Sequence, residues 1–129
     1  MDRATAMAVA AARDAVLDAG ASLAPSSTRT GIYWGTCMGA AGTLEECYRG
    51  IFQDDNWRLK PTTIVTGMNN SPAALISLEF GILCPSLTYS VACASSAIAV
   101  GDAMRAIRLG LSDSAIGWCS GTQLTPRVV

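Results

Sequence analysis

Short apolar stretches that favour β-strands alternate along the chain with longer patterns that favour α-helices. Three stretches predict strands, at residues 30–36, 85–92 and 113–119. Four longer patterns predict helices, at residues 2–19, 43–52, 71–81 and 94–109. Strands separated by helices in this way build a layered α/β fold with a largely buried sheet, and no internal repeat interrupts the alternation.

Several helix boundaries are marked by residues that commonly begin or end helices. Glycines follow three of the helical patterns, at positions 20, 81 and 110. Thr43 followed by Glu46 resembles a capping box, which predicts that Thr43 caps the helix over 43–52. Ser71 followed by Pro72 predicts that Ser71 is the N-cap of the next helix, because proline suits the first helical turn.

The first and last helical patterns carry different side chains. The pattern over 2–19 is rich in alanine, so we expect this helix to pack closely against a neighbour. The pattern over 94–109 contains four large apolar side chains, which we expect in the core. They are Ile98, Met104, Ile107 and Leu109.

A glycine-rich segment, 35–42, follows the first predicted strand. Its glycines at 35, 39 and 42 do not match the dinucleotide-binding pattern GxGxxG, and it lacks the Gly-Lys-Ser/Thr ending of a phosphate-binding loop. The segment is therefore not expected to bind a nucleotide. Its glycines more simply permit the backbone to approach a ligand or a neighbouring helix closely.

Cys93 stands where the predicted strand 85–92 gives way to the predicted helix 94–109. A thiol at a helix N-terminus feels the positive end of the helix dipole and unpaired backbone N–H groups, which favour the thiolate. The same N–H groups can hold an oxyanion when a cysteine attacks a carbonyl or a thioester. In most chains, however, a cysteine among alanine, valine and serine is a buried small apolar residue, and the flanking residues alone leave both interpretations open.

The composition argues against nucleic acid and membrane as partners. The net charge is -1 with the two signs mixed along the chain, and there is no basic patch. No apolar run reaches the roughly 18 residues that span a bilayer, and the first residues do not form a signal peptide, so we expect a cytoplasmic protein. Hydrophobic residues make up 50% of the chain and charged residues 15%, which indicates surface that is buried by something else.

The five cysteines and the absence of histidine limit the chemistry. The cysteines are widely spaced and form no CxxC pair, so we interpret them as free thiols. A zinc or haem site would have almost no ligands to draw on, and we expect neither a metal nor a cofactor. A cysteine nucleophile normally needs a proton-transfer partner, and only carboxylates, arginines and Lys60 are available for that role.

Short motifs occur in order along essentially the whole chain. They are Asp2-Arg3, Asp18-Ala19-Gly20, Thr30-Gly31-Ile32, Gly35-Thr36-Cys37-Met38-Gly39, Met68-Asn69-Asn70-Ser71-Pro72-Ala73, Leu78-Glu79-Phe80-Gly81 and Val91-Ala92-Cys93-Ala94-Ser95-Ser96. With these separations the set resembles the β-ketoacyl-acyl carrier protein synthases, the ketosynthases of fatty acid and polyketide assembly. The resemblance favours the nucleophile interpretation of Cys93.

The resemblance implies a thiolase-like αβαβα sandwich of two similar halves, of which residues 1–129 form most of the first. Cys93 matches the cysteine that accepts an acyl group from the phosphopantetheine arm of an acyl carrier protein. The backbone N–H of that cysteine forms half of the oxyanion hole. In the family, the acyl group is then condensed with malonyl-carrier protein after decarboxylation.

The resemblance also implies substrate-binding positions and a dimer. Met38 matches a position that lines the acyl-chain pocket, where the size of the side chain affects the chain length accepted. Thr63, Ile64 and the turn over 67–72 match a region near the dimer interface and the end of that pocket. We therefore expect a homodimer or heterodimer, with Met38 and Ile64 as substrate-binding residues.

Several features of the resembled family are absent from residues 1–129. Its first strand and glycine loop would precede Asp2, and its two histidines, a lysine and a Gly-Phe-Gly loop would follow Val129. The histidines hold the malonyl carboxylate and stabilise the enolate, so this segment alone is expected to be incapable of condensation and to need the remainder of the synthase fold. The alternative function is a non-catalytic partner subunit that determines chain length, although such partners usually lack the cysteine.

Overall fold

The computed structural model describes residues 2–20 and 28–119. Its helices are α1 (Arg3–Asp18), α2 (Ala41–Phe52), α3 (Thr63–Gly67), α4 (Ser71–Phe80) and α5 (Ser95–Arg108). Its strands are β1 (Thr30–Gly35), β2 (Ser86–Tyr89) and β3 (Ser114–Cys119). Most of the loop predicted over 20–30 lies outside the described residues. Within the described ranges, no helix combines the length and the apolar character that crossing a membrane requires.

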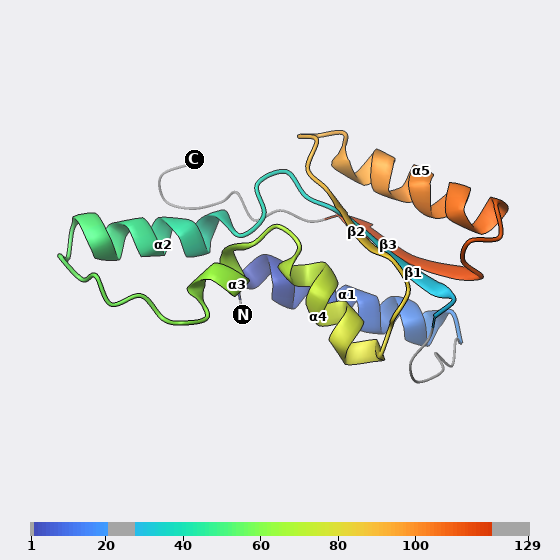
Figure 1. The fold of residues 1–129 in the computed structure, drawn as a ribbon, viewed down its shortest axis with the longest axis horizontal. Coiled ribbons are helices and arrows are strands. Elements are labelled where there is room, and N and C mark those ends of the chain that lie inside the picture. The colour runs from blue at the N-terminus through green and yellow to red at the C-terminus, as the bar shows by residue number, and fades with distance from the viewer. Residues whose placement is uncertain (1, 21–27, 120–129) are drawn as a thin grey trace.

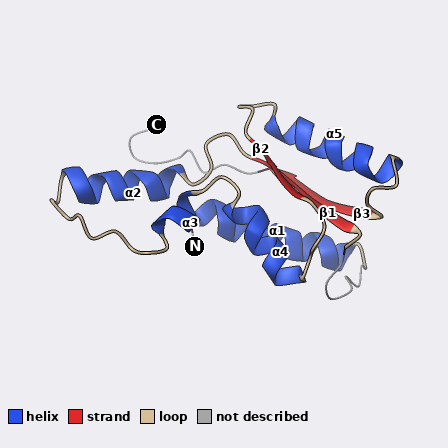
Figure 2. Ribbon diagram, viewed as in Figure 1, coloured by secondary structure: helices blue, strands red, loops and turns tan. Residues whose placement is uncertain are grey.

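The three strands form one parallel sheet with β1 in the centre, in the order β2-β1-β3. All six residues of β1 are buried, which confirms the buried strand that the sequence predicted. Gly35, the last residue of β1, pairs with Tyr89 in β2 and with Cys119 in β3. The three strands therefore end together at one edge, which we call the carboxyl edge of the sheet (Figure 2).

Helices cover both faces of the sheet. Helices α1 and α4 lie on one face, and α5 lies on the other (Figure 1). Because side chains alternate along a strand, Ile32 and Trp34 of β1 pack against α1 and α4, whereas Tyr33 packs against α5. The structure is thus a three-layer α/β/α arrangement. Figures 1 and 2 also show α2 projecting away from the sheet.

The helix and strand types predicted from the sequence are confirmed, but several boundaries are wrong. Helix α2 begins two residues before Thr43, its N-cap is Ala40, and no side chain caps it, so the predicted capping box does not form. Ser71 is the first residue of α4, and Asn70 occupies the N-cap position. Strand β2 ends at Tyr89 rather than at residue 92.

Helix α3, a single turn, was not predicted at all. Its five residues are too few to show a helical period, and a short apolar run fits a strand or an irregular segment equally well.

Helix α1 packs closely against α4, as its alanines predicted. Ala4, Ala8 and Ala12 are buried, and small side chains let the two helix backbones approach. The Asp2 carboxylate caps the helix, accepting hydrogen bonds from the N–H groups of Ala4 at 2.8 Å and Thr5 at 3.2 Å. The chain leaves the helix at Gly20, whose φ is +59°.

Helix α5 corrects the prediction about its large side chains. Ile98, Met104, Ile107 and Leu109 are 37%, 49%, 44% and 66% exposed. The side chains that are buried instead are small, namely Ser95, Ala99, Ala103 and Ala106. The helix lies so close to the sheet that only small side chains fit between them, and Met104 and Ile107 lie beside this contact, where they line a pocket with Ala115 and Gly117 of β3.

The closest approach between α5 and the sheet is at Gly35. A Cβ atom on Gly35 would lie 2.6 Å from the carbonyl oxygen of Ser95 and 2.9 Å from the nitrogen of Ser96. The absence of a side chain at Gly35 is what allows the end of β1 to contact the first turn of α5. This confirms that a glycine of the segment 35–42 permits close approach to a helix.

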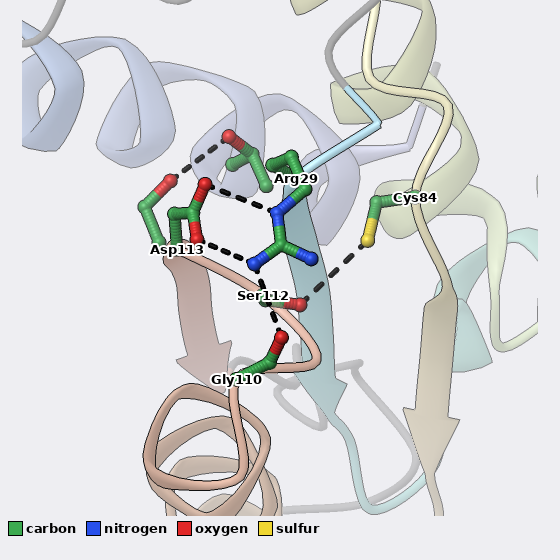
Figure 3. Close-up of polar contacts among 7 residues, drawn as sticks. Arg29, Cys84, Gly110, Ser112 and Asp113 are labelled. Atoms are coloured by element: carbon green, nitrogen blue, oxygen red, sulfur yellow. Dashed lines mark hydrogen bonds and ion pairs between the residues drawn. The ribbon is translucent and has the colours of Figure 1, made fainter.

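Arg29 holds the opposite, amino edge of the sheet (Figure 3). Its Nε donates to Asp113 Oδ2 at 3.1 Å, and its Nη2 donates to Asp113 Oδ1 at 2.6 Å and to the Gly110 carbonyl at 3.0 Å. These hydrogen bonds hold the pKa of the Asp113 carboxyl below its ordinary value. Any stabilisation of the folded state by this ion pair is therefore present at a pH above the ordinary pKa of the Asp113 carboxyl. It is lost as the pH falls through the lowered pKa of that carboxyl. The pair is exposed, so we expect a small contribution.

We predict opposite effects of adding a methyl group at two glycines. Gly35→Ala should lower the free energy of unfolding by about 1–3 kcal/mol, because the new Cβ would overlap the backbone of α5. Gly101→Ala is the control, since no atom lies within 4 Å of its Cβ position inside α5, and it should raise the free energy of unfolding by about 0.5–1 kcal/mol. Urea unfolding followed by circular dichroism measures both. Equal stability of Gly35→Ala and the parent chain would contradict the close contact.

Candidate functional site

Cys93 is exposed on the turn between β2 and α5, at the carboxyl edge of the sheet. The turn is closed by two backbone hydrogen bonds, from Ala94 N–H to the Val91 carbonyl at 3.1 Å and from Ser95 N–H to the Ala92 carbonyl at 3.3 Å. Ala92 has a φ of +47°, a left-handed conformation that costs a non-glycine residue about 1 kcal/mol or more. The residue before Cys93 is therefore in a sharp, strained bend.

The Ser95 hydroxyl lies beneath this bend and is 1% exposed. It accepts a hydrogen bond from Val91 N–H at 2.8 Å. It faces two acceptors, the Ala92 carbonyl at 2.7 Å and the Thr36 carbonyl at 2.9 Å, between which its single hydrogen is shared. One side chain thus connects the start of α5 with the bend and with the end of β1.

A second contact joins the bend to the loop that follows β1. Ser90 Oγ donates to the Cys37 carbonyl at 3.2 Å and accepts from Asn69 Nδ2 at 3.5 Å. Asn69 also lies against Gly39, where φ is +56° and a Cβ atom would come within 2.1 Å of Asn69 Oδ1. Three loops that are far apart in sequence therefore meet beside Cys93.

The structure brings two of the three predicted site residues to the same edge of the sheet. Met38, 48% exposed, lies in the loop that Ser90 holds through the Cys37 carbonyl, and Cys93 lies three residues after Ser90. Ile64 is on α3 and is 75% exposed. It takes no part in the hydrogen bonds that join the loops, so the geometry does not connect it directly to Cys93.

Sequence reasoning missed Asn69, Ser90 and Ser95 as parts of this site. Asparagine in a turn is ordinary, and the serines stand in a segment of small residues where no pattern separates a structural hydroxyl from an exposed one. The positions of Ser90 and Ser95 close to Cys93 were the one available signal. These two serines, however, bond the carbonyls of residues 37 and 36, more than fifty positions away in the chain, and Asn69 bonds Ser90, which is 21 positions away.

A separate polar groove of about 400 Å³ lies between α2, α3 and the segment 53–62. Its lining includes Glu46, Arg58 and Lys60, but none of Cys93, Met38 and Ile64. Cys93 instead stands on an open surface. In the described part of the chain, no three Cys, Asp or Glu side chains are grouped as metal ligands would be.

The arrangement around Cys93 suits nucleophilic chemistry on a carbonyl compound. The thiol is accessible, it stands immediately before a helix of 14 residues, and the first N–H groups of such a helix lack intrahelical partners. The N–H groups of Ala94 and Ser95 already donate to the Val91 and Ala92 carbonyls, so an oxyanion that forms next to the thiol can be stabilised by the remaining N–H groups at this end of the helix and by the helix dipole. The chain contains no histidine to move protons at this site.

A family model described as the β-ketoacyl synthase N-terminal domain matches residues 1–129, the whole chain. Nodulation protein E of Rhizobium leguminosarum bv. trifolii is 33% identical over 129 residues, which is 97% of this chain and 31% of that protein. The chain belongs to the β-ketoacyl synthase family and corresponds to its N-terminal domain. It spans about a third of the length of the relative.

Solved structures show the same fold. The ishigamide ketosynthase/chain length factor matches with a TM-score of 0.81 at 23% identity, over 94% of this chain and 34% of that one. A ketosynthase solved in complex with its type II PKS acyl-carrier protein matches with a TM-score of 0.89 at 24% identity. The match covers 99% of this chain and 33% of the ketosynthase chain. A β-ketoacyl synthase from Burkholderia phymatum matches with a TM-score of 0.72 at 25% identity, over 87% and 28%. The fold is thus the thiolase-like α/β fold of ketosynthases, as expected.

We predict that thiol accessibility follows the structure. Cys37, Cys93 and Cys119 are exposed, whereas Cys47 and Cys84 are partly buried, with Cys84 Sγ 3.6 Å from the Ser112 hydroxyl. Iodoacetamide should therefore modify the three exposed cysteines of the folded chain first, as mass mapping of time points will show. In urea the five rates should converge. Early modification of Cys84 in the folded chain would be inconsistent with this arrangement.

Proposed function

We propose that this domain accepts an acyl group on Cys93 from the phosphopantetheine arm of an acyl carrier protein, as the first step of a β-ketoacyl synthase reaction. The single observation that carries the proposal is the exposed Cys93 on a strained turn directly before α5. Family membership supports it. So does the similar ketosynthase whose structure is described as a complex with an acyl-carrier protein.

The proposed step is a thioester exchange. The Cys93 sulfur attacks the carbonyl carbon of the acyl-phosphopantetheine thioester, and the carbonyl oxygen becomes an oxyanion. The backbone N–H of Cys93 stabilises that charge, because the N–H groups of Ala94 and Ser95 already donate to the Val91 and Ala92 carbonyls. The original carbon–sulfur bond then breaks, the new one to Cys93 remains, and the phosphopantetheine thiol leaves with the proton that Cys93 gave up.

Met38 and Ile64 are proposed to contact the acyl chain. Met38 is partly exposed in the loop that Ser90 and Asn69 hold near the Cys93 turn, so its flexible side chain is available to an acyl group attached there. Ile64 is exposed on α3, five residues before Asn69, and would lie further along the chain path. A larger side chain at Met38 would then favour shorter acyl chains.

Condensation is proposed to need the remainder of the synthase fold and a dimer. Decarboxylation of a malonyl group requires groups that stabilise an enolate, and the 129 residues contain no histidine. Met104 and Ile107 of α5 and Leu111 of the turn that follows it are each 44% or more exposed, which is apolar surface that further parts of the synthase would cover. We propose a cytoplasmic enzyme of fatty acid or polyketide synthesis on these grounds.

A non-catalytic chain-length partner is the competing function. One similar structure is described as a ketosynthase/chain length factor, which shares the fold. A partner that only shapes a pocket has no need of an accessible thiol on a strained turn. The presence of Cys93 in that position therefore favours the catalytic subunit.

Replacing Cys93 tests the proposal. Incubation with an acyl-loaded carrier protein should add one acyl group to a Cys93-containing peptide of the parent chain. Cys93→Ala should abolish this adduct, and Cys119→Ala, which removes another exposed thiol at the carboxyl edge, should retain it. Intact-mass and peptide mass spectrometry measure both. Acylation of a different cysteine with Cys93 unmodified would refute the proposal, and undiminished product formation by Cys93→Ala in a complete assembly would favour the partner function.

We also predict that the 129-residue chain alone releases no carbon dioxide from malonyl-carrier protein. Acylated Cys93 supplies only the electrophile, and no residue of the chain matches the family's enolate-stabilising histidines. Trapping of labelled carbon dioxide over many turnovers measures the reaction, with a complete ketosynthase as the positive control. Steady decarboxylative condensation by the purified chain would overturn this expectation.

A further inference from the structure

Ser95 connects all the backbone segments that determine where Cys93 lies. Its hydroxyl is bonded to Val91 N–H and to the Ala92 carbonyl, which belong to the two residues directly before Cys93. It is also bonded to the Thr36 carbonyl at the end of β1. Both Ser95 and Thr36 are 1% exposed, so water does not readily replace the hydrogen bond between them, whereas the bonds to Val91 and Ala92 are part-buried.

The bend that Ser95 supports does not persist by its own preference. Ala92 adopts a φ of +47°, and an alanine in this region needs surrounding contacts to stay there. Ser95 bonds the Ser90–Val91 peptide group through the Val91 N–H and the Ala92–Cys93 peptide group through the Ala92 carbonyl, so it holds the backbone on both sides of the bend. Without the hydroxyl, the bend can relax toward an ordinary conformation, and Cys93 moves with it.

The neighbouring serines do not have this role. Ser96 is half-buried, and its side chain makes no hydrogen bond with the described residues. Ser90 is exposed and bonds the Cys37 carbonyl and Asn69, so it holds the loop of Met38 rather than the bend itself. Ser96→Ala is therefore a matched control, one position away and in the same helical turn.

We propose that Ser95 is a positioning residue for acyl transfer to Cys93, an inference that rests on the function proposed above. The hydroxyl acts through the bend and does not touch the substrate. It anchors Cys93 to the rigid end of β1, so the sulfur and the oxyanion-stabilising N–H groups keep one relative position during the attack. A displacement of about 1 Å between such groups lowers a rate by about 10²-fold.

The test measures acyl transfer from an acyl-carrier protein at saturating and at low donor concentration. Ser95→Ala should lower the maximal rate of acylation of Cys93 by about 10-fold to 10²-fold and leave the half-saturating donor concentration unchanged. Ser96→Ala should keep the parent rate. Ser95→Thr retains the hydroxyl and should restore at least a third of the parent rate, which simple loss of packing at a buried site would not permit.

The outcomes separate the two proposals. If Cys93 of the parent chain accepts no acyl group, the proposed function fails. If the parent is acylated and Ser95→Ala is acylated equally fast, or changes only the half-saturating concentration, the role of Ser95 is refuted.

Hydrogen exchange keeps the inference testable if Ser95→Ala does not fold. In the parent chain the Val91 amide should exchange at least tenfold more slowly than an unstructured amide, because it donates to the buried Ser95 oxygen. Unprotected exchange at Val91 in the folded parent would refute the inference without any variant.

Discussion

The contact between the end of β1 and the first turn of α5 is the constraint on which the rest of the structure depends. Gly35 provides the space, since any side chain there would overlap the Ser95 backbone, and the Ser95 hydroxyl then bonds the next carbonyl along, that of Thr36. When a helix packs this close to a sheet, only small side chains fit on the helix face that contacts the sheet. The alanines that face β1 and the exposed large residues of α5 are both consequences of that single contact.

The same contact decides where chemistry can occur. Parallel strands in equal register end at one edge, so the turns after β1 and β2 must meet there. The sheet supplies a rigid base, and the turns carry Cys93 and Met38, the residues proposed to act on a substrate. Ser95 holds the bend before Cys93 to the end of β1, and Ser90 holds the loop of Met38 beside it. Its location therefore follows from backbone contacts that close packing creates.

Much of the fold was predictable from the sequence, because local pattern and burial agree along β1 and in the alanine-rich helix α1. The residues on the inward face of α5 were not predictable, since large apolar residues normally lie in the core. The short distance between α5 and the sheet is what places small residues there instead. The capping box at Thr43 failed because helix α2 starts earlier, on a backbone turn with no side-chain cap. The position of Cys93 between a strand and a helix was predictable from the sequence, whereas the contacts of Asn69 and Ser95 depend on partners that are distant in sequence.

The two edges of the sheet are stabilised by different kinds of interaction, and the difference suits the roles that we propose for them. At the amino edge, Arg29 and Asp113 form an exposed ion pair that water and salt weaken, and no strained backbone depends on it. At the carboxyl edge, the bonds of Ser95 are neutral and therefore insensitive to salt, and the one to the Thr36 carbonyl is buried and costly to leave unmade. A strained turn that carries the proposed nucleophile needs the second kind of support, since any loosening of the bend would misplace the sulfur. The strained conformation of Ala92 is therefore maintained by the hydrogen bonds of Ser95, which connect it to the buried end of β1.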